Sequence, residues 1–398
     1  MLADRLRRRD PEARALSPDG RTWLCVRDVL AVPPAAGDVV PVATSDPVEA
    51  VRRIVAAQLA GAVPVVLPVG AAAPPVPAEP GTLALATSGT TSAPRVVLRT
   101  AASWDAALDA FSQVTGQEPD DVAWAPGPPS STLTLWAIHH ALSTGTPVVA
   151  TGAHRGVPGG LEDVTVVHTV PAVLADVLAV RGSGGLPRLR LAVVAGAALP
   201  AALRARAERL GIRIVEYYGA AELSFVAADP DGAGLRAFPG VGLRVRDGRV
   251  EVRSPYVALG YAAGGGPLSV VDGWAGVGDR GRLASDGVLV VEGRDDGLSV
   301  GGTTVLVGDV ERVLGAVDGV LDVACTGEPD ARLGERPVAA VRPAAGVDPA
   351  RLVRELRDAA RRELPAAARP VRYVVVEAVP RTPVGKADRP ALRRLLAR

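Results

Sequence analysis

The chain has 398 residues, a length that predicts two or three domains. Its formal net charge is +1 and charged residues make up 22% of it, which argues against nucleic acid and anionic membranes as partners. Two cysteines, Cys25 and Cys325, exclude a disulfide framework and a cysteine metal cluster, so we expect buried, inert thiols.

The beginning of the chain predicts neither secretion nor membrane insertion. Its first ten residues are charged, and no apolar segment of the kind found in signal peptides follows them. No run of about 18 apolar residues occurs, so no transmembrane helix is expected. Together with the cysteine usage, these features predict a cytoplasmic protein.

The first 240 residues alternate between helical and extended patterns. Asp46 is the expected N-cap of a helix that has Pro47 at its first position and ends at Gly61, before a buried strand at 63–67. Further helices are expected at 101–114, 133–143, 171–180 and 200–210, and further strands at 83–86, 146–150, 164–168, 189–194 and 212–216. This alternation predicts a parallel α/β core.

The pattern changes near Val241. Short strands at 241–253, 256–261, 268–272 and 287–292 predict a small β subdomain. Beyond it, helices are expected at 308–316, 349–363 and 388–396, and strands at 320–326, 337–342 and 371–376. We therefore expect an α/β and α+β protein with a large domain over 1–293, whose β subdomain covers about 241–293, and a small α+β domain over 294–398.

A hydroxyl-rich turn follows the expected strand at 83–86. Hydroxyls and backbone N–H groups in a glycine-containing turn can surround phosphate oxygens, and an arginine adds charge. The candidate phosphate-binding residues are Thr87, Ser88, Gly89, Thr90, Thr91 and Arg95. An ordinary polar turn is the alternative.

The segment Tyr217-Tyr218-Gly219-Ala220-Ala221-Glu222 follows the expected strand at 212–216. Ligands of parallel sheets bind at the carboxyl ends of the strands. A carboxylate at this place can hold Mg²⁺ together with nucleotide phosphates. The alternative for Glu222 is a helix-start residue favoured by the helix dipole.

Further acidic residues lie near the boundary between the domains. Asp279 precedes an expected hairpin whose turn is Asp286-Gly287, and its carboxylate can accept bonds from both hydroxyls of a ribose. Arg294-Asp295-Asp296 stands where the pattern changes, so a hinge is expected there.

One residue stands out by composition. Lys and Arg total 44, yet the sequence contains a single lysine, Lys386. An ammonium is a compact point charge and a guanidinium is a wide planar fork, so a lysine kept against this bias marks a place where arginine does not substitute. It lies in Pro380-Arg-Thr-Pro-Val-Gly-Lys-Ala-Asp-Arg389, which predicts an extended loop before the last helix. A surface lysine without a role is the alternative.

Taken in order, these four motifs resemble those of the superfamily of acyl-CoA synthetases, adenylation domains and luciferases. The similarity runs from residue 83 to 398 and rests on Thr-Ser-Gly-Thr-Thr, Tyr-Gly-x-x-Glu, Gly-Asp-x-Gly with Gly-Arg-Asp-Asp, and Pro-Arg-Thr-Pro-x-Gly-Lys-x-x-Arg. The short segment before the phosphate loop is similar to that of short bacterial acyl-CoA synthetases and o-succinylbenzoate–CoA ligases.

The resemblance implies roles for the motif residues. Lys386 would bridge the carboxylate and the α-phosphate, Glu222 would bind Mg²⁺, and Tyr218 would stack near adenine with Gly219 beside it. The remaining implied roles are ribose binding by Asp279 and Arg294, an adenine border at Gly196 and Ala197, a hinge at Asp295 or Asp296, and a pantetheine path along Gly301 and Gly302. The small domain would rotate about the hinge.

The implied reaction joins a carboxylic acid to ATP and then to a thiol, with ATP, Mg²⁺ and coenzyme A taking part. Two alternatives remain open. One is adenylation with another acceptor, such as a carrier-protein phosphopantetheine, an amine, or an aryl amine undergoing diazotisation. The other is a non-catalytic nucleotide-binding relative, because Thr-Ser-Ala-Pro-Arg replaces the Thr-Gly-x-Pro-Lys usual in the superfamily and its aromatic-His signature is missing. A homodimer is compatible with the sequence.

Overall fold

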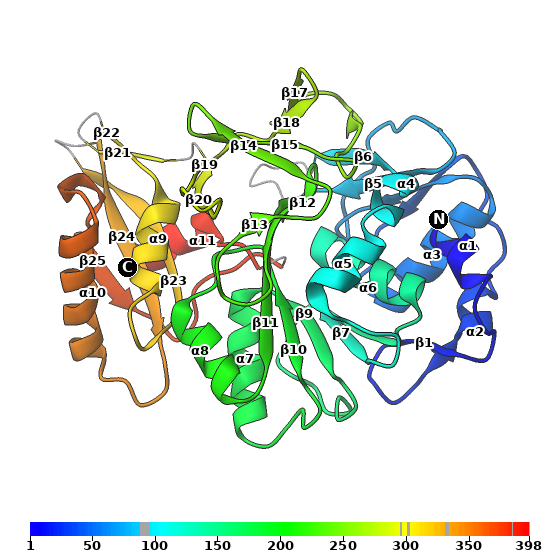
Figure 1. The fold of residues 1–398 in the computed structure, drawn as a ribbon, viewed down its shortest axis with the longest axis horizontal. Helices are drawn as coiled ribbons and strands as arrows, with labels where there is room; N and C mark the ends of the chain where they lie inside the picture. Colours follow the sequence, from blue (N-terminus) through cyan, green and yellow to red (C-terminus); the bar gives the residue numbers. More distant parts are fainter. Residues whose placement is uncertain (88–94, 295–296, 301–302, 331–333, 384, 398) are drawn as a thin grey trace.

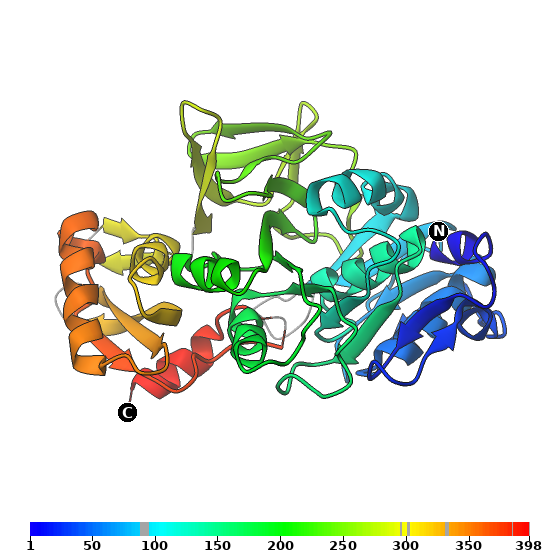
Figure 2. The same ribbon diagram turned by 60° about the horizontal axis from the view of Figure 1, so that its bottom comes forward.

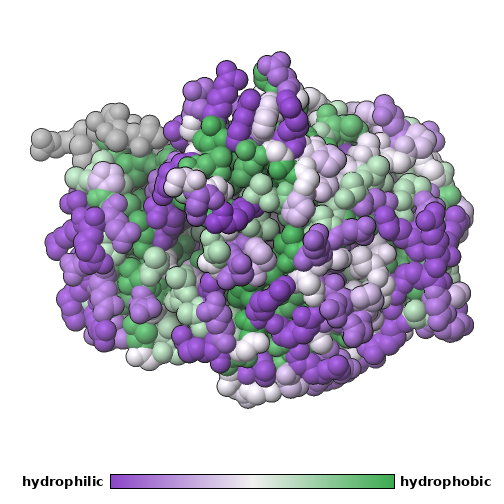
Figure 3. All heavy atoms as spheres, in the orientation of Figure 1, coloured by the Kyte–Doolittle hydropathy of each residue, from purple (hydrophilic) through white to green (hydrophobic). Residues whose placement is uncertain are grey.

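The structure is a computed structural model, and it describes residues 1–87, 95–294, 297–300, 303–330, 334–383 and 385–397. Three sheets build the larger part of the molecule, and a fourth sheet forms a separate lobe, at the left of Figure 1. Hydrophobic side chains gather toward the middle of the face seen in Figure 3, while its two ends are mainly hydrophilic.

The largest sheet has nine strands in the order β13-β12-β11-β10-β9-β7-β8-β1-β2. Its strands are β1 (Arg14–Ser17), β2 (Leu24–Cys25), β7 (Ala123–Pro126), β8 (Val148–Gly152), β9 (Val166–Thr169), β10 (Leu191–Val194), β11 (Arg213–Ala220), β12 (Ser224–Asp229) and β13 (Arg236–Ala237). In this order, the six neighbouring strands β11, β10, β9, β7, β8 and β1 are all parallel, which confirms the expected parallel α/β core. The helices of this part are α1 (Leu2–Leu6), α2 (Val26–Leu30), α6 (Thr132–Thr144), α7 (Pro171–Gly182) and α8 (Ala201–Arg209).

A second, five-stranded sheet has the order β16-β6-β5-β4-β3. Its elements are β3 (Val39–Val42), α3 (Pro47–Leu59), β4 (Val63–Val66), β5 (Thr82–Ala86), β6 (Val96–Thr100), α4 (Ala101–Asp105), α5 (Leu108–Thr115) and β16 (Gly260–Tyr261). Asp46 caps α3 as expected, because its carboxylate accepts from the N–H groups of Val48 and Glu49. The single helix expected at 101–114 is interrupted after Asp105 and forms α4 and α5.

The third sheet forms the expected β subdomain above the large sheet in Figure 1. It consists of β14 (Gly242–Arg246), β15 (Arg249–Arg253), β17 (Ser269–Val271), β18 (Trp274–Gly276), β19 (Asp279–Leu283) and β20 (Leu289–Arg294). The strand expected at 256–261 is reduced to β16, which leaves this subdomain and pairs with β6. A segment from the β region thereby reaches the hairpin that carries the candidate phosphate loop.

The small lobe has its own core, centred on Val310, Leu314, Leu352 and Leu356. Its elements are β21 (Leu298–Val300), β22 (Thr303–Val305), α9 (Val307–Gly315), β23 (Val320–Asp330), β24 (Gly334–Pro343), α10 (Pro349–Glu363), a short 3₁₀ turn (Ala366–Ala368), β25 (Arg372–Val375) and α11 (Arg389–Leu396). The loop that leads into α11 leaves this lobe and reaches toward the middle of the molecule in both ribbon views (Figures 1 and 2).

The two cysteines differ in their surroundings. Cys325 is buried, and burial raises the pKa of its thiol, as expected of an inert side chain. Cys25 is only half-buried and its Sγ lies 3.0 Å from an Asp28 carboxylate oxygen, so the prediction of burial was wrong there because the residue lies at a sheet edge, where a helix begins. No helix in the described ranges combines the length and hydropathy needed to traverse a bilayer.

Candidate active site

The candidate residues converge at the carboxyl ends of neighbouring parallel strands. Thr169, Val194 and Glu216 occupy the same level on β9, β10 and β11. Gly196 lies two residues past the paired level on β10, and Tyr218 lies two residues past it on β11. This edge of the sheet is where an α/β protein binds its ligands.

Glu222 lies in the tight turn between β11 and β12, so no helix begins there and the helix-start alternative is wrong. Its carboxylate is buried and accepts a 2.7 Å hydrogen bond from the Tyr261 hydroxyl. Burial, with the Glu222 carboxylate as second cause, raises the pKa of Tyr261. Gly219 makes the turn possible, because a β-carbon there would lie 1.9 Å from the Ser224 carbonyl oxygen.

The Tyr218 side chain joins the large sheet to the β subdomain. Its hydroxyl donates a 2.5 Å hydrogen bond to the buried Asp279 carboxylate. Asp279 in turn stands opposite Arg294 in the β19–β20 register. The two candidate ribose residues are therefore neighbours across a strand pair, beside the candidate adenine residue.

The candidate phosphate loop is described at its two ends. The Thr87 N–H donates a 2.7 Å bond to the Arg95 carbonyl, which closes the β5–β6 hairpin. Ser88, Gly89, Thr90 and Thr91 lie outside the described residues. The pairing of Tyr261 with Val97 brings Tyr261, and with it Glu222, to the strand that leaves this loop.

Lys386 lies in a compact turn, which corrects the expected extended loop. The Thr382 N–H donates to the Lys386 carbonyl at 2.7 Å, and the Lys386 N–H donates to the Thr382 hydroxyl at 3.2 Å. Arg381 and Ala387 form a bridge at the base of the turn. The backbone groups of this turn therefore bond to one another, because the proline- and glycine-rich sequence does not form a helix or strand. The Lys386 side chain is exposed at the tip of the turn.

The lysine turn touches the large domain at Val170, directly after β9. A β-carbon on Gly385 would lie 2.5 Å from Val170 Cγ2, and one on Gly196 would lie 3.3 Å from Val170 Cγ1. Val170 therefore packs against both Gly196 and Gly385. A cavity of about 180 Å³ opens beside this contact and is lined from both domains, among others by Ala197, Leu199, Glu311, Asp322 and Arg381.

Two arginines hold the ends of the lysine turn. The Arg381 guanidinium binds both oxygens of the buried Asp322 carboxylate on β23 and also the Val323 carbonyl at 3.2 Å. The Arg389 guanidinium binds the Glu311 carboxylate at 2.7 Å and the Cys325 carbonyl. Bidentate arginine contacts fix geometry more tightly than single ones do, so this turn is mounted rigidly on the small domain.

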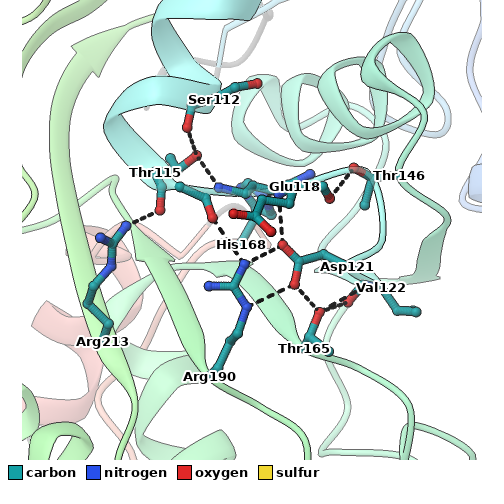
Figure 4. A network of polar contacts seen from close by, with 12 residues as sticks. Ser112, Thr115, Glu118, Asp121, Val122, Thr146, Thr165, His168, Arg190 and Arg213 are labelled. Atoms are coloured by element: carbon teal, nitrogen blue, oxygen red, sulfur yellow. Dashed lines mark hydrogen bonds and ion pairs between the residues drawn. The ribbon is translucent and has the colours of Figure 1, made fainter.

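A polar network at the opposite edge of the large sheet has a different character (Figure 4). Asp121 accepts from Arg190 at 2.5 and 2.9 Å and from Thr165 at 2.7 Å. Thr165 and Arg190 directly precede β9 and β10, so the network lies at the amino ends of the strands, away from the ligand edge. It ties the segment after α5 to the sheet and has a structural function.

His168 is the last-but-one residue of β9, and its imidazole is buried against Gln117 at 2.7 Å. Burial lowers the pKa of His168 to about 4. It belongs to a ring cluster in which Phe111 contacts Trp136, Tyr217 and Phe225 at centroid distances of 5.1 to 5.9 Å. Phe111, Trp136 and Phe225 belong to the main hydrophobic core, and Tyr217 packs against it.

The candidate hinge residues Asp295 and Asp296 and the candidate thiol-path residues Gly301 and Gly302 lie outside the described residues. The sequence motifs do not include Val170, Tyr261 or Arg99, although Val170 contacts Gly196 and Gly385, Tyr261 donates to Glu222, and Arg99 donates to Ala221 and Ser224 beside it. Nothing in the sequence marks Val170, whose role depends on a contact between domains. Arg99 does not stand out because arginine is abundant in this sequence, although its place within an apolar strand indicates a buried charge.

The arrangement fits a nucleotide-bound divalent cation better than a dedicated metal cage. No group of three or more His, Cys, Asp or Glu side chains with metal-ligand spacing occurs in the described ranges. Mg²⁺ is commonly held by one or two carboxylates together with substrate phosphates and water. The buried Glu222 carboxylate lies near the base of the candidate phosphate loop, and a carboxylate at that place fits such binding.

Comparison with known proteins agrees with this geometry. The family described as AMP-binding enzyme matches residues 38–261, and the family described as AMP-binding enzyme C-terminal domain matches residues 309–386. A probable 2-succinylbenzoate–CoA ligase of Mycobacterium tuberculosis is 31% identical over 334 residues, covering 79% of this chain and 84% of the relative. The fatty acid–[acyl-carrier-protein] ligase MmaC of Mycobacterium marinum is 28% identical over 355 residues, covering 77% and 66%.

Among solved structures, a variant of MenE from E. coli with bound OSB-AMS superposes with a TM-score of 0.79 at 21% identity, covering 99% of this chain and 98% of that one. At this identity the match establishes the fold. The expected fold class, a large α/β domain followed by a small α+β domain, is confirmed.

Proposed function

The chain belongs to the AMP-binding enzyme family, and we propose that it uses ATP to convert a carboxylic acid to an acyl adenylate and then transfers the acyl group to the thiol of coenzyme A. It is an acid–thiol ligase, and ATP and coenzyme A are its co-substrates. The observation that carries the assignment of residues is the contact of Gly385 and Gly196 with Val170, which supports placing Lys386 at the ligand edge of the sheet.

In the first half-reaction, a carboxylate oxygen attacks the α-phosphorus, a new P–O bond forms, and pyrophosphate leaves with the electrons of the broken bond. Negative charge accumulates on the oxygens around the α-phosphorus. Lys386 supplies a fixed cation at that place, and electrostatic preorganisation of this kind is usually the largest catalytic contribution. Its compact ammonium can lie between two anions, which a wide guanidinium cannot do as readily.

The nucleotide is assigned to candidate residues that come from all three sheets of the large domain. Thr87, Arg95 and the intervening residues 88–91 are assigned to the phosphates, Tyr218 and Gly219 to adenine with Gly196 and Ala197, and Asp279 and Arg294 to the ribose. Mg²⁺ bound by Glu222 would neutralise phosphate charge. The 2.5 Å bond from Tyr218 to Asp279 supports this assignment, because it holds the candidate base and ribose contacts in one geometry.

In the second half-reaction, the thiol sulfur attacks the acyl carbon, a thioester forms, and AMP leaves. We assign Asp295 or Asp296 as the hinge about which the small domain rotates between the two steps, and Gly301 and Gly302 as the path for pantetheine. Lys386 would then act in the first step and leave the site for the second. The similarity to MmaC favours a carrier-protein phosphopantetheine as the second candidate acceptor, with the same thiol chemistry.

A screen for pyrophosphate release across aliphatic, aryl and amino acids tests the proposal. We expect one class of acid to support release that depends on ATP and Mg²⁺ and that falls when Lys386 is replaced by Ala. Mass spectrometry with coenzyme A or a phosphopantetheinylated carrier protein then identifies the acceptor. Absence of release with every acid, together with wild-type behaviour of Lys386→Ala, would contradict the assignment.

A further inference from the structure

Arg99 on β6 is the most completely buried charged side chain at the site, with a relative exposure of 0%. Burying a guanidinium costs several kcal/mol unless its surroundings compensate for the lost hydration. Burial lowers the pKa of Arg99 to about 9, and the nearby Glu222 carboxylate partly offsets that shift. A charge retained at such a place requires an explanation beyond ordinary packing.

The contacts of Arg99 surround the turn that carries Glu222. One terminal nitrogen donates to the Ser224 hydroxyl at 2.5 Å, and the other donates to the Ala221 carbonyl at 3.1 Å. Ala221 directly precedes Glu222, and Ser224 follows it by two positions. The second nitrogen also donates to the Tyr256 carbonyl at 3.2 Å.

The same turn is held from its other side. The Ser224 hydroxyl lies 3.1 Å from the Tyr256 carbonyl, and the Ala258 N–H donates to the Glu222 carbonyl at 2.7 Å. Ser224 has a φ of +57°, a conformation that a non-glycine residue adopts only when its surroundings impose it. The guanidinium bond to its hydroxyl is one of the contacts that impose this conformation.

Arg99 also connects two parts of the site that are distant in sequence. It stands on the strand that leaves the phosphate loop, four residues after Arg95. Val97 and Leu98 of that strand pair with Tyr261 and Gly260, and the Tyr261 hydroxyl donates to Glu222. The phosphate-loop hairpin is therefore connected to the Glu222 turn in two ways. Arg99 binds the turn itself, and Tyr261, which pairs with the same strand, donates to the carboxylate.

We propose that Arg99 is a positioning residue for the adenylation half-reaction, which orients the Glu222 carboxylate toward the phosphate loop by clamping the turn from Ala221 to Ser224. The proposal rests on the proposed function, in which Glu222 holds the metal that accompanies ATP. Arg99 touches neither substrate nor metal. Its effect is transmitted through the turn, and it should not matter for thiol attack on an acyl adenylate that already exists.

The test compares the two half-reactions in Arg99→Gln, Arg99→Lys and the wild type. We expect Arg99→Gln to lower the rate of ATP–pyrophosphate exchange by about 100-fold, since displacing a catalytic group by about 1 Å has an effect of this size. The concentration of Mg²⁺ needed for half-maximal exchange should rise. Arg99→Lys should fall between the two, because it keeps the charge and loses the fork. Thioester formation from a synthetic acyl adenylate should change by less than about threefold.

A double-mutant cycle with Glu222→Gln separates positioning from a general loss of structure. In the Glu222→Gln background, Arg99→Gln should have little further effect on exchange, because the group that it positions is gone. Additive losses, or equal losses in both half-reactions, would overturn the proposal. If the wild type itself showed no exchange with any acid, the proposed function would fail first, and that result is distinguishable from a failure confined to Arg99.

Two more variants keep the test decisive if Arg99→Gln does not fold. Ser224→Ala removes one acceptor of the guanidinium and should lower exchange by about tenfold with thioester formation unchanged, as for the loss of one charge-assisted hydrogen bond. Arg9→Gln is the matched control, because Arg9 also donates to two backbone carbonyls, those of Leu142 and Gly145 at 3.1 and 2.8 Å, remote from the site. It should leave both half-reactions unchanged. Wild-type exchange in Ser224→Ala would contradict the proposal.

Discussion

Gly385 packs so closely on Val170 that a β-carbon on the glycine would lie 2.5 Å from a Val170 methyl carbon. Gly385 precedes Lys386 and belongs to the small domain, whereas Val170 directly follows β9 in the large domain. The docking of the lysine turn on the ligand edge therefore depends on the absence of one side chain.

Gly385→Ala should consequently weaken the docking of the lysine turn on the large domain. Its φ of +82° costs an alanine about 1–2 kcal/mol wherever it occurs, and the clash with Val170 adds to this cost. We expect pyrophosphate release to fall by about 100-fold. Gly346→Ala is the control, because Gly346 has a φ of +80° in the same domain with open space around its would-be β-carbon. Equal effects of the two substitutions would show that backbone strain alone is responsible.

Lys386→Ala should reduce pyrophosphate release by about 100- to 1,000-fold, the size expected when one preorganised donor is removed from developing charge. Reaction of a synthetic acyl adenylate with coenzyme A should remain near the wild-type rate. Lys386→Arg keeps the charge on a wider group and should recover only part of the activity. Loss of both half-reactions in Lys386→Ala would show that the lysine also acts during thiol transfer.

Tyr218→Phe removes the 2.5 Å hydrogen bond to Asp279 and leaves the ring in place. The Asp279 carboxylate then loses a partner at a buried position, so we expect the KM for ATP to rise by about tenfold with a smaller change in kcat. Tyr373→Phe, in the small domain, provides the control for loss of a tyrosine hydroxyl. A decrease in kcat at unchanged KM would point instead to a role in the chemical step.

A second contact between the domains involves Asp176 on α7. Its carboxylate lies 3.1 Å from His154 Nε2 and 3.3 Å from an Arg342 nitrogen on β24. Arg342→Gln should weaken the docked arrangement and lower pyrophosphate release by up to about fivefold at low salt, the limit for a partly exposed ion pair. Added salt should abolish the difference from wild type. Arg351→Gln breaks an exposed pair within the small domain, with Glu355, and should have no such effect.

The buried histidines predict an acid-sensitive stability. Burial lowers the pKa of His168 from 6.5 to about 4 and that of His140 to about 3. Between those values and about pH 6.5 the unfolded chain binds protons that the folded chain does not, so the free energy of unfolding should decrease as the pH falls. His168 alone should lower the free energy of unfolding by about 3 kcal/mol as the pH falls from 6.5 to 4. Above pH 6.5 the imidazole is neutral in both states and has no further effect on this pH dependence.

Denaturant unfolding at a series of pH values measures this dependence. His168→Gln keeps a polar partner for Gln117 and removes the titrating group, so its stability should fall less steeply between pH 6.5 and 4. The slope is the relevant quantity, since the substitution also changes packing against Phe111. An unchanged slope would show that His168 titrates alike in both states.

The sequence was informative where local chemistry determines local structure. Asp46-Pro47 predicted the start of α3, and apolar runs predicted the parallel strands from β8 to β11 within a few residues. The motif around Lys386 predicted a loop before α11, but the loop is a closed turn. The hydrogen bonds between Thr382 and Lys386 replace those of a helix or strand, and proline and glycine content alone cannot predict them.

The contacts that assemble the site could not be predicted from local sequence patterns, because they join residues that are distant in sequence. Val170 acquires its role because two glycines, 26 and 215 positions further along the chain, approach it in space. Tyr261 reaches Glu222 because β16 leaves its own subdomain and pairs with β6. Glu222 itself looked compatible with a helix start, and only the antiparallel pairing of β11 with β12 shows that it occupies a turn.

The exposed tip of the turn that carries Lys386 also makes it a convenient reporter. Because the sequence has no second lysine, an amine-selective reagent finds one side-chain target in the whole protein. A fluorophore attached there would occupy the region between the two domains without cysteine engineering. The rate of its attachment, followed with and without ATP and acid, would read out how well bound ligands shield that amine from solvent.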